Sequence, residues 1–421
     1  MEILIPYGRS KKKITIAENR IEKIVHCRLN EYRPEKSEQE LIRDAMACPI
    51  GSSTLRELAQ NRKKVVIIAS DHTRPVPSRL IMPEMLREIR EGNPEAEITI
   101  LIATGCHRET SREELVGKFG EEIVEKENIV VHDCDSNDMT FLGYLPSGGE
   151  LWINSIAANA DLLVSEGFIE PHFFAGYSGG RKSVLPGIAK RETVYANHCA
   201  GFINSSEARC GVLDGNPIHR DMIYAAEQAH LAYIVNVVIN SAHEVVGAFA
   251  GDVNKAHRAG CEFLDQLSRE CPVQADIVVT SNNGYPLDQN IYQAVKGLCT
   301  AADCVKENGV IIMFAECEDG IGGEGFYRTF KEAASAREVL EEISAVPQSE
   351  TKADQWQSQI LARILCKCSV IFVSAADDQI VRDLHMIPAS SFEEALQKAE
   401  EITGEESRIV FVPEGITSFF A

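Results

Sequence analysis

Short apolar runs recur along this chain, each bounded by polar or glycine-containing segments and separated by stretches of helical periodicity. The runs are continuously apolar and rich in β-branched residues, which is typical of strands buried on both faces of a parallel sheet. They are Val65–Ser70, Glu97–Ala103, Asn128–His132, Asp161–Ser165, Ala232–Ile239, Ala275–Thr280, Gly309–Phe314, Ser369–Ser374 and Arg408–Val412. The alternation of such strands with helical segments, for example Leu80–Arg90 and Arg112–Glu125, predicts an α/β fold with largely parallel sheets.

The length of 421 residues exceeds the size at which a single hydrophobic core usually stops growing, so we expect two α/β domains. A helical pattern ends and a new strand begins around Leu264–Val273, which predicts a boundary there. We therefore predict an N-terminal domain over residues 1–270 and a C-terminal domain over 271–405, with an active-site cleft between them. We expect the last segment, 406–421, to return to the N-terminal domain.

The formal net charge of −21 argues against nucleic acid or an anionic membrane as a partner, since both select basic surfaces. A small anionic substrate would have to meet cations held locally in a cleft. The 13 cysteines are irregularly spaced and form no C-x-x-C pair, which favours free thiols over disulfides or a zinc ribbon. No signal-like segment opens the sequence and no apolar run has the length of a membrane span, so we expect a cytoplasmic protein.

Histidines follow three of the predicted strands, at the edge where open α/β sheets bind ligands. The segments are Asp71-His72-Thr73-Arg74-Pro75, Thr104-Gly105-Cys106-His107-Arg108 and Glu166–His172, the last of which runs into Gly176–Ser183. A single loop histidine usually only hydrogen-bonds to the backbone. Several histidines at one sheet edge, beside Arg74 and Lys182, predict an active site instead.

Lys182 and His198 are ambiguous on local pattern alone. The glycine-rich segment Gly176–Ser183 invites a phosphate-loop interpretation, but a Walker loop needs glycine directly before its lysine and Arg181 stands there. A tight turn with a solvent-facing lysine and a loop that approaches a phosphate or reactive group are equally supported. His198 follows a helical pattern, where it could ligate a transition metal or cap the helix, and the spacing favours the cap.

The second domain offers one clear element, a predicted helix from about Leu287 to Val305. A polar face carries Gln289, Gln293 and Lys296, opposite an apolar face of Ile291, Val295 and Leu298. Pattern alone favours a solvated polar face. The alternative is that the amide and ammonium donors reach into an interdomain cleft and hold a carboxylate.

Four segments together resemble the nickel-dependent lactate racemase family, over essentially the whole chain. They are Asp71-His72-Thr73-Arg74-Pro75-Val76-Pro77, Ala103-Thr104-Gly105-Cys106-His107-Arg108, Glu166–Asn197 with the following His198, and Gly284–Gly297. The resemblance implies a racemase that interconverts L- and D-lactate by hydride abstraction and return through a nickel-pincer nucleotide cofactor. It also implies cofactor-biosynthesis proteins as partners.

Residue by residue, the resemblance implies that Lys182 carries the cofactor covalently and that His198 supplies a nickel ligand. The Asp71, His72, Thr73 and Arg74 turn would contact the cofactor. His107 and His172 would be the acid/base pair, and Arg74, Gln293 and Lys296 would bind the substrate.

Three alternatives remain open on the sequence. The same cofactor could serve a racemase or epimerase of another 2-hydroxy acid. A zinc hydrolase could use His107, His172 and His198 as three ligands. The chain could also be a non-catalytic nucleotide-binding or sensor protein. In that case, replacing His107 or His172 would leave ligand binding intact.

Overall fold

A computed structural model describes residues 1–420, which form two compact units. The first unit combines Met1–Arg28, Cys199–Gly211 and Ser268–Ala421, and the second combines Leu29–His198 with Val212–Leu267. The last crossing of the chain between the units therefore falls inside the predicted boundary segment. The earlier crossings, at residues 28–29, 198–199 and 211–212, were not predicted.

The second unit is built on a six-stranded sheet in the order β13-β12-β9-β4-β5-β6. All neighbours are parallel except β12 and β13, which are antiparallel. Alternate residues of β4 (Lys64–Ser70), among them Val65 and Ile67, enter a core with Ile81, Met85 and Ile89 of α3 (Ser78–Gly92). The intervening Val66 and Ile68 are buried as well, which explains the continuous apolar run in the sequence.

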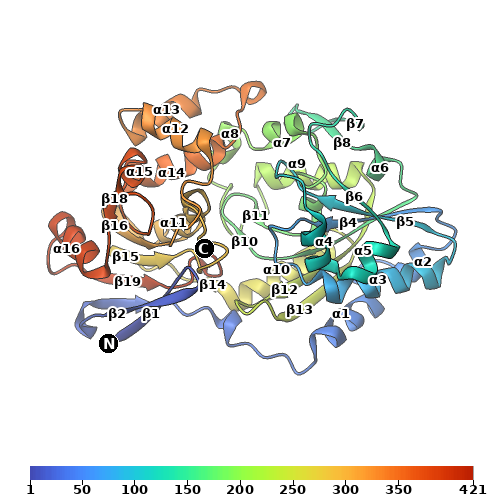
Figure 1. The fold of residues 1–421 in the computed structure, drawn as a ribbon, viewed down its shortest axis with the longest axis horizontal. Helices are drawn as coiled ribbons and strands as arrows, with labels where there is room; N and C mark the ends of the chain where they lie inside the picture. The colour runs from blue at the N-terminus through green and yellow to red at the C-terminus, as the bar shows by residue number, and fades with distance from the viewer. Residues whose placement is uncertain (421) are drawn as a thin grey trace. The chain divides into compact units, whose positions relative to one another are not determined.

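The other elements of this sheet and its unit follow in chain order, as Figure 1 shows. They are α1 (Glu38–Ala47), α2 (Leu55–Leu58), β5 (Glu97–Ala103), α4 (Arg112–Phe119), α5 (Glu121–Lys126), β6 (Asn128–Val131), β7 (Met139–Tyr144), β8 (Glu150–Asn154), α6 (Ser155–Ala158), β9 (Leu162–Phe168), β10 (Pro171–His172), β11 (Gly176–Tyr177), η3 (Gly180–Ser183), α7 (Arg191–Asn197), α9 (Pro217–Gln228), β12 (Leu231–Ile239), β13 (Val245–Gly251) and α10 (Lys255–Ser268), with η2 (Arg28–Asn30) at its start.

The first unit is built on a six-stranded parallel sheet in the order β18-β17-β16-β15-β19-β3. One face packs against a core that joins Ile3 and Ile5 of the β1–β2 hairpin with Phe392 and Ala395 of α16. The helices α11 and α14 contact β15 and β16, and α14 also contacts β17. Both sheets are thus buried on both faces, as the continuous apolar runs in the sequence predict.

The elements of this unit are again given in chain order. They are β1 (Glu2–Tyr7), β2 (Ser10–Thr15), η1 (Glu18–Arg20), β3 (Ile21–Ile24), α8 (Ala200–Ile203), β14 (Arg269–Glu270), β15 (Ala275–Ser281), α11 (Ile291–Ala302), β16 (Val305–Phe314), α12 (Glu324–Glu332), α13 (Ala336–Ser344), η4 (Gln348–Glu350), α14 (Gln355–Lys367), β17 (Ser369–Val373), α15 (Asp378–Asp383), β18 (Ile387–Ala389), α16 (Phe392–Thr403), β19 (Ile409–Val412) and β20 (Phe419–Phe420).

The prediction that residues 406–421 return to the N-terminal domain is wrong. The strand β19 lies between β15 and β3, with Ile409 paired to Ile277 on one side and to Ile21 on the other. A fully buried strand such as β19 needs a hydrogen-bonded neighbour on each side. The start of the chain, predicted as part of the N-terminal domain, supplies one of these neighbours and so belongs to the first unit.

The nine predicted strands are confirmed, and the α/β class with largely parallel sheets is confirmed with them. The predicted helix Arg112–Glu125 is instead two helices, α4 and α5, which part at Gly120. Gly120 has φ of 89°, a left-handed backbone that ends α4 without the cost a side chain would add. Among residues 1–420, none of the helices combines the length and apolarity that a membrane crossing requires.

Candidate active site

Three neighbouring strands of the second unit deliver the histidine-bearing segments to one edge of the sheet. The strand β4 lies between β9 and β5 and runs parallel to both, so the three carboxyl ends meet at the same edge. Asp71–Arg74 follows β4, His107 follows β5, and His172 follows β9. The structure therefore brings together the segments that the sequence analysis singled out.

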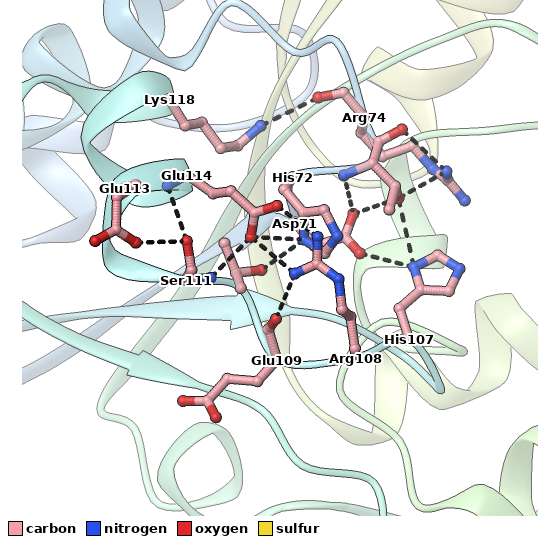
Figure 2. A network of polar contacts seen from close by, with 12 residues as sticks. Asp71, His72, Arg74, His107, Arg108, Glu109, Ser111, Glu113, Glu114 and Lys118 are labelled. Atoms are coloured by element: carbon pink, nitrogen blue, oxygen red, sulfur yellow. Dashed lines mark hydrogen bonds and ion pairs between the residues drawn. The ribbon is translucent and has the colours of Figure 1, made fainter. Parts of the chain in front are cut away.

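A carboxylate–imidazole pair stands at this edge. Asp71 Oδ2 lies 2.7 Å from His107 Nδ1, and Figure 2 shows the two side chains pointing toward each other from the two strand ends. Asp71 is 1% exposed, whereas the His107 side chain is 45% exposed. When Nδ1–H donates to Asp71, the neutral ring carries no proton on Nε2, the nitrogen turned away from Asp71.

Several donors keep Asp71 ionised. Burial alone would raise the pKa of this carboxyl, but the hydrogen bond from His107, together with the His107 and Arg74 charges and the Thr73 hydroxyl, holds it well below its usual range. Thr73 Oγ1 donates to Asp71 Oδ1 over 2.7 Å, and the Thr73 amide donates to the same oxygen over 3.2 Å. Arg74 Nη1 in turn donates to Thr73 Oγ1 over 3.0 Å. Asp71 is thus a fixed negative charge that orients His107.

His72 lies on the other side of this turn, against the start of α4. Its Nδ1 is 3.1 Å from Thr110 Oγ1 and 3.7 Å from Glu114 Oε2. Burial lowers the pKa of His72, which favours the neutral ring. Glu114 also accepts from Arg108 Nη2 over 2.6 Å and closes the capping box of α4 with Ser111. In this arrangement His72 ties the turn to α4.

A partly buried lysine, Lys118, supports the same turn. Lys118 Nζ donates to the backbone carbonyl of Arg74 over 3.4 Å, as Figure 2 shows. Burial lowers the pKa of Lys118, while the Glu166 and Asp71 carboxylates oppose that shift. Glu166 is fully enclosed and accepts a hydrogen bond of 2.6 Å from Ser78 Oγ. Charged groups under the Asp71–Arg74 turn were not predicted, because Lys118 and Glu166 have no distinctive spacing in the sequence.

His172 comes from a tight hairpin, β10–β11, directly after β9. The Ala175 amide donates to His172 Nδ1 over 3.2 Å. In this arrangement the neutral ring carries its proton on Nε2. His172 stacks on Phe173 with ring centroids 4.9 Å apart. The ring is therefore held by packing as well as by a backbone donor.

The ring of Phe174 links three of the predicted site residues. Its centroid lies 4.5 Å from the His172 ring and 5.1 Å from the His198 ring, and Lys182 Nζ is 5.8 Å from it. His198, His172 and Lys182 are thus gathered around one aromatic side chain. Phe174 was missed by the sequence analysis, since aromatic residues after a strand are usually core.

The chemistry of His198 and Lys182 fits a nickel cofactor. Burial, followed by the Lys182 charge, lowers the pKa of His198 to about 3, so the imidazole is neutral at physiological pH. A neutral imidazole is the form that binds transition metals, nickel among them. Lys182 lies in η3, two residues after Gly180, which like Gly179 has a positive φ, and offers an amine for covalent attachment.

Arg181, which breaks the Walker pattern, is fully buried and braces the loop that carries Lys182. Its Nη2 donates to Ala175 O over 2.7 Å, and Nη1 lies 3.0 Å from His257 Nε2. Burial lowers the pKa of Arg181 to about 10, which leaves the guanidinium charged. Arg181 therefore points into the protein, where its guanidinium holds the backbone of the loop that carries Lys182.

In the first unit, α11 presents the predicted substrate-binding residues. Gln293 and Lys296 are partly exposed, whereas Ile291, Val295 and Leu298 are buried. The helix begins after Asn290, whose side chain caps the Gln293 amide, so Gln289 lies before the helix and not on its polar face. Asn282, which follows β15, holds the helix by donating to Gln293 O and accepting from the Gly297 amide.

The geometry does not support a three-histidine zinc site. Within residues 1–420, the only group of three His, Cys, Asp or Glu ligand atoms within 4.8 Å of one another is Asp133, Cys134 and Asp135. His107, His172 and His198 form no such group. Their separation favours distinct roles for the three rings.

Comparison with known families covers nearly the whole chain. Residues 7–211 match the lactate racemase N-terminal domain, and residues 271–420 match the lactate racemase C-terminal domain. A lactate racemase of Thermoanaerobacterium thermosaccharolyticum is 52% identical over 417 residues, which span 99% of this chain and 98% of that protein. A lactate racemase of Lactiplantibacillus plantarum is 50% identical over 387 residues, which span 91% of each chain.

Solved structures give the same result. The lactate racemase apoprotein from T. thermosaccharolyticum superposes with a TM-score of 0.97 at 51% identity, and each chain is covered completely. A protein from Thermotoga maritima superposes with a TM-score of 0.66 at 18% identity, over 93% of this chain and 99% of the other. The second likeness shows a shared fold alone.

Proposed function

Because the chain belongs to the lactate racemase family, we propose that it interconverts L- and D-lactate at the sheet edge that carries His107 and His172. The proposal is supported by the full-length likeness to lactate racemases at about half identity. It is also supported by two histidines on one sheet edge, each with its ring held by a defined partner.

The family is nickel-dependent, and we propose that this chain uses nickel in the form of a nickel-pincer nucleotide. Lys182 would carry the cofactor covalently, and His198 would be the protein ligand to nickel. The cofactor would also be contacted by the turn formed by Asp71, His72, Thr73 and Arg74. When bound, the cofactor supplies an electrophilic carbon that can take up the C2 hydrogen of lactate as a hydride. The neutral, buried His198 and its electrostatic contact with Lys182 support this assignment.

The role of His107 follows from its pairing with Asp71. Loss of a C2 hydrogen with its electron pair is easier when the hydroxyl proton leaves at the same time, so a base must contact the substrate oxygen. His107 Nε2 is turned away from Asp71 and offers that base. Asp71 fixes the ring and stabilises the positive charge that the ring gains with the proton.

His172 would act on the opposite enantiomer. The two enantiomers present the hydroxyl group on different sides of C2, so one histidine cannot reach both. After the 2-oxo acid turns its other face, His172 would exchange the proton with the substrate oxygen. Stacking on Phe173 and contact with Phe174 hold the ring in place for that exchange.

The substrate carboxylate requires local cations, since the chain carries a net charge of −21. We propose that Arg74, Gln293 and Lys296 bind it. Arg74 is held beside Asp71 by its bond to Thr73. Gln293 and Lys296 share the exposed side of α11 and supply an amide donor and an ammonium.

The Asp71–His107 pair is the observation that carries the proposal, because a buried carboxylate on an exposed imidazole is an arrangement for proton transfer. The test uses chain produced in the cytoplasm together with nickel and the cofactor-making proteins, which we propose as its partners. Enantiopure lactate should racemise, and the peptide that carries Lys182 should gain the mass of the cofactor. The variant Lys182→Ala should show neither. A protein inert toward lactate but active on a longer 2-hydroxy acid would overturn the substrate assignment.

A further inference from the structure

The loop that carries Lys182 is held by a buried side-chain amide of the sheet. Asn236 lies on β12, in register with Gly167 of β9, and is fully enclosed. Its side-chain oxygen Oδ1 accepts a hydrogen bond of 2.7 Å from the backbone amide of Gly180. Gly180 is the first residue of η3 and stands two positions before Lys182. The bond therefore joins the sheet directly to the turn that presents the lysine.

Only the oxygen of this side-chain amide is used. Within residues 1–420, the nitrogen Nδ2 of Asn236 is buried and has no acceptor among the protein groups. Burying an amide nitrogen without an acceptor costs free energy. The flanking positions of β12 hold the fully buried Val235 and Val237, and an apolar residue at position 236 would avoid that cost. Packing of the strand therefore does not account for an asparagine at this position, whereas the bond to Gly180 does.

A second side chain, His257 of α10, packs against the same turn. The His257 ring is buried, and its Nε2 lies 2.7 Å from the Ser178 carbonyl oxygen. A Cβ atom at Gly180 would stand 2.9 Å from the nearest ring carbons of His257. A Cβ atom at Gly179 would stand 2.8 Å from Asn236 Oδ1. The turn thus fits against Asn236 and His257 because these two positions carry no side chain.

The backbone of Lys182 is bonded on both sides of its Cα atom. Its amide donates to the Gly179 carbonyl over 3.2 Å, and its carbonyl accepts from the Gly187 amide over 3.1 Å. The amine Nζ lies 5.8 Å from the centre of the Phe174 ring, which also contacts the His198 ring. A shift of the turn away from Asn236 would be passed through this short backbone segment to the amine.

We propose that Asn236 is a positioning residue for the covalent attachment of the cofactor. Its amide oxygen holds Gly180 so that the Lys182 amine stands where the nickel-pincer nucleotide is joined to the chain. In the overall step, the Lys182 nitrogen forms a bond to a thiocarboxylate carbon, and the oxygen of that carbon leaves as water with two hydrogens of the ammonium. The inference rests on the proposed function, because it takes Lys182 as the attachment point.

The first test measures attachment. Apoprotein is incubated with nickel and the cofactor-making proteins, and samples taken over time are digested with trypsin. Because trypsin does not cut after a lysine whose amine is joined, loaded chain gives residues 182–190 as one peptide and unloaded chain gives 183–190. Asn236→Leu has a similar size but no acceptor, and we expect it to load about 10-fold more slowly than the wild type, or slower still. Asn236→Asp keeps an oxygen for the Gly180 amide and should load nearly as the wild type does. Loading of Asn236→Leu at the wild-type rate would overturn the proposal.

The matched control is Asn240→Leu, which removes a buried amide directly after the same strand. Asn240 donates to Glu244 and accepts from the Ala242 amide, so it holds the β12–β13 connection and does not touch the Lys182 loop. This variant should load as the wild type does, and thermal unfolding of each apoprotein reports its stability. Equally slow loading of Asn236→Leu and Asn240→Leu would assign the effect to lost stability and would contradict a positioning role.

The second test needs no cofactor. Hydrogen exchange of the apoprotein, followed by mass spectrometry of the peptide that covers Gly180, should be about 5-fold faster or more in Asn236→Leu than in the wild type. Asn236→Asp should restore slow exchange, and an unchanged rate in Asn236→Leu would overturn the proposal. A wild type that gains no mass at Lys182 would refute the proposed function. A wild type that loads beside an Asn236→Leu variant that loads equally well would refute only the role of Asn236.

Discussion

Asp71 and His107 form a carboxylate–imidazole pair across 2.7 Å, although they come from the ends of two different strands. The pair exists because β4 and β5 are parallel neighbours whose carboxyl ends meet. Asp71 is enclosed and His107 is exposed, so the charge that orients the ring is protected while the reactive nitrogen can reach a substrate. The predictions below test this pair and the groups around it.

Replacing the Asp71 carboxylate by an amide should slow racemisation. Asp71→Asn keeps the size of the side chain, but its amide no longer supports positive charge on His107 and no longer fixes which ring nitrogen is bare. We expect kcat to fall by about 10²–10⁴, the usual contribution of a positioned acid–base group. The measurement is steady-state racemisation of L-lactate.

The control for this change is Glu113→Gln, which removes a carboxylate from the first turn of α4 without touching Asp71 or His107. Its kcat should match that of the wild type. An Asp71→Asn variant within 3-fold of the wild type, a loss of under about 1 kcal/mol in transition-state stabilisation, would mean that the pair has no role in proton transfer.

Variants of His107 and of His172 should retain activity toward opposite enantiomers of lactate. His107→Asn and His172→Asn should each lose at least about 10² in racemisation, because both enantiomers require a base. In a single turnover stopped with acid, each variant should still form the 2-oxo acid from one enantiomer, and the preferred enantiomer should be opposite in the two variants. Identical enantiomer preferences would contradict the assignment of one histidine to each.

Buried neutral histidines should make the fold sensitive to mild acid. Burial, with the Arg181 and Arg258 charges, lowers the pKa of His219 to about 3 in the folded chain, against about 6.5 when unfolded. Between these values only the unfolded chain binds the proton, so this stabilisation is complete above pH 6.5 and is lost as the pH falls toward 3.

The titration of His219 alone sets the expected size of this loss of stability. Between pH 7 and pH 5, His219 should account for at most about 2 kcal/mol of lost stability. His219→Gln should therefore show a smaller fall in the free energy of urea unfolding over this range than the wild type. His243→Gln, at an exposed position, is the matched control. An equal fall in His219→Gln and the wild type would refute the assignment.

Phe174 should matter to cofactor loading as well as to turnover. Its ring contacts His172 and His198 and lies under Lys182 Nζ. Phe174→Leu keeps an apolar side chain but loses the flat surface, so we expect a lower fraction of Lys182 peptide carrying cofactor and a lower kcat. Phe263→Leu, an aromatic change in α10 of the same unit, should leave the loaded fraction unchanged. Loading equal in both variants would count against a role for Phe174.

The sheet edge could be predicted from the sequence because buried parallel strands leave continuous apolar runs, and the residues after each run are then known. The pattern of runs alone places His107, His172 and the Asp71–Arg74 turn at one edge. Lys182 and His198 were ambiguous, since a glycine-rich turn and a helix end have several ordinary uses. Only the family resemblance gave them a chemical role.

Contacts between distant segments could not be predicted. The link through Phe174 and the bracing of the loop by Arg181 depend on tertiary packing, which leaves no period in the sequence. The place of β19 was predicted wrongly for the same reason. An apolar strand of four residues fits either sheet. Its pairing with β15 and β3 depends on the register of those two strands, which its own sequence does not indicate.

The fate of the C2 hydrogen tests the central claim most directly. Holoenzyme should racemise L-lactate deuterated at C2 in ordinary water, and the product should be examined by mass spectrometry at low conversion. If His107 and His172 move only the hydroxyl proton while the C2 hydrogen returns as a hydride, nearly all D-lactate should keep its deuterium. Complete loss of the label to water would show that a histidine removes the C2 hydrogen as a proton, and would contradict the account.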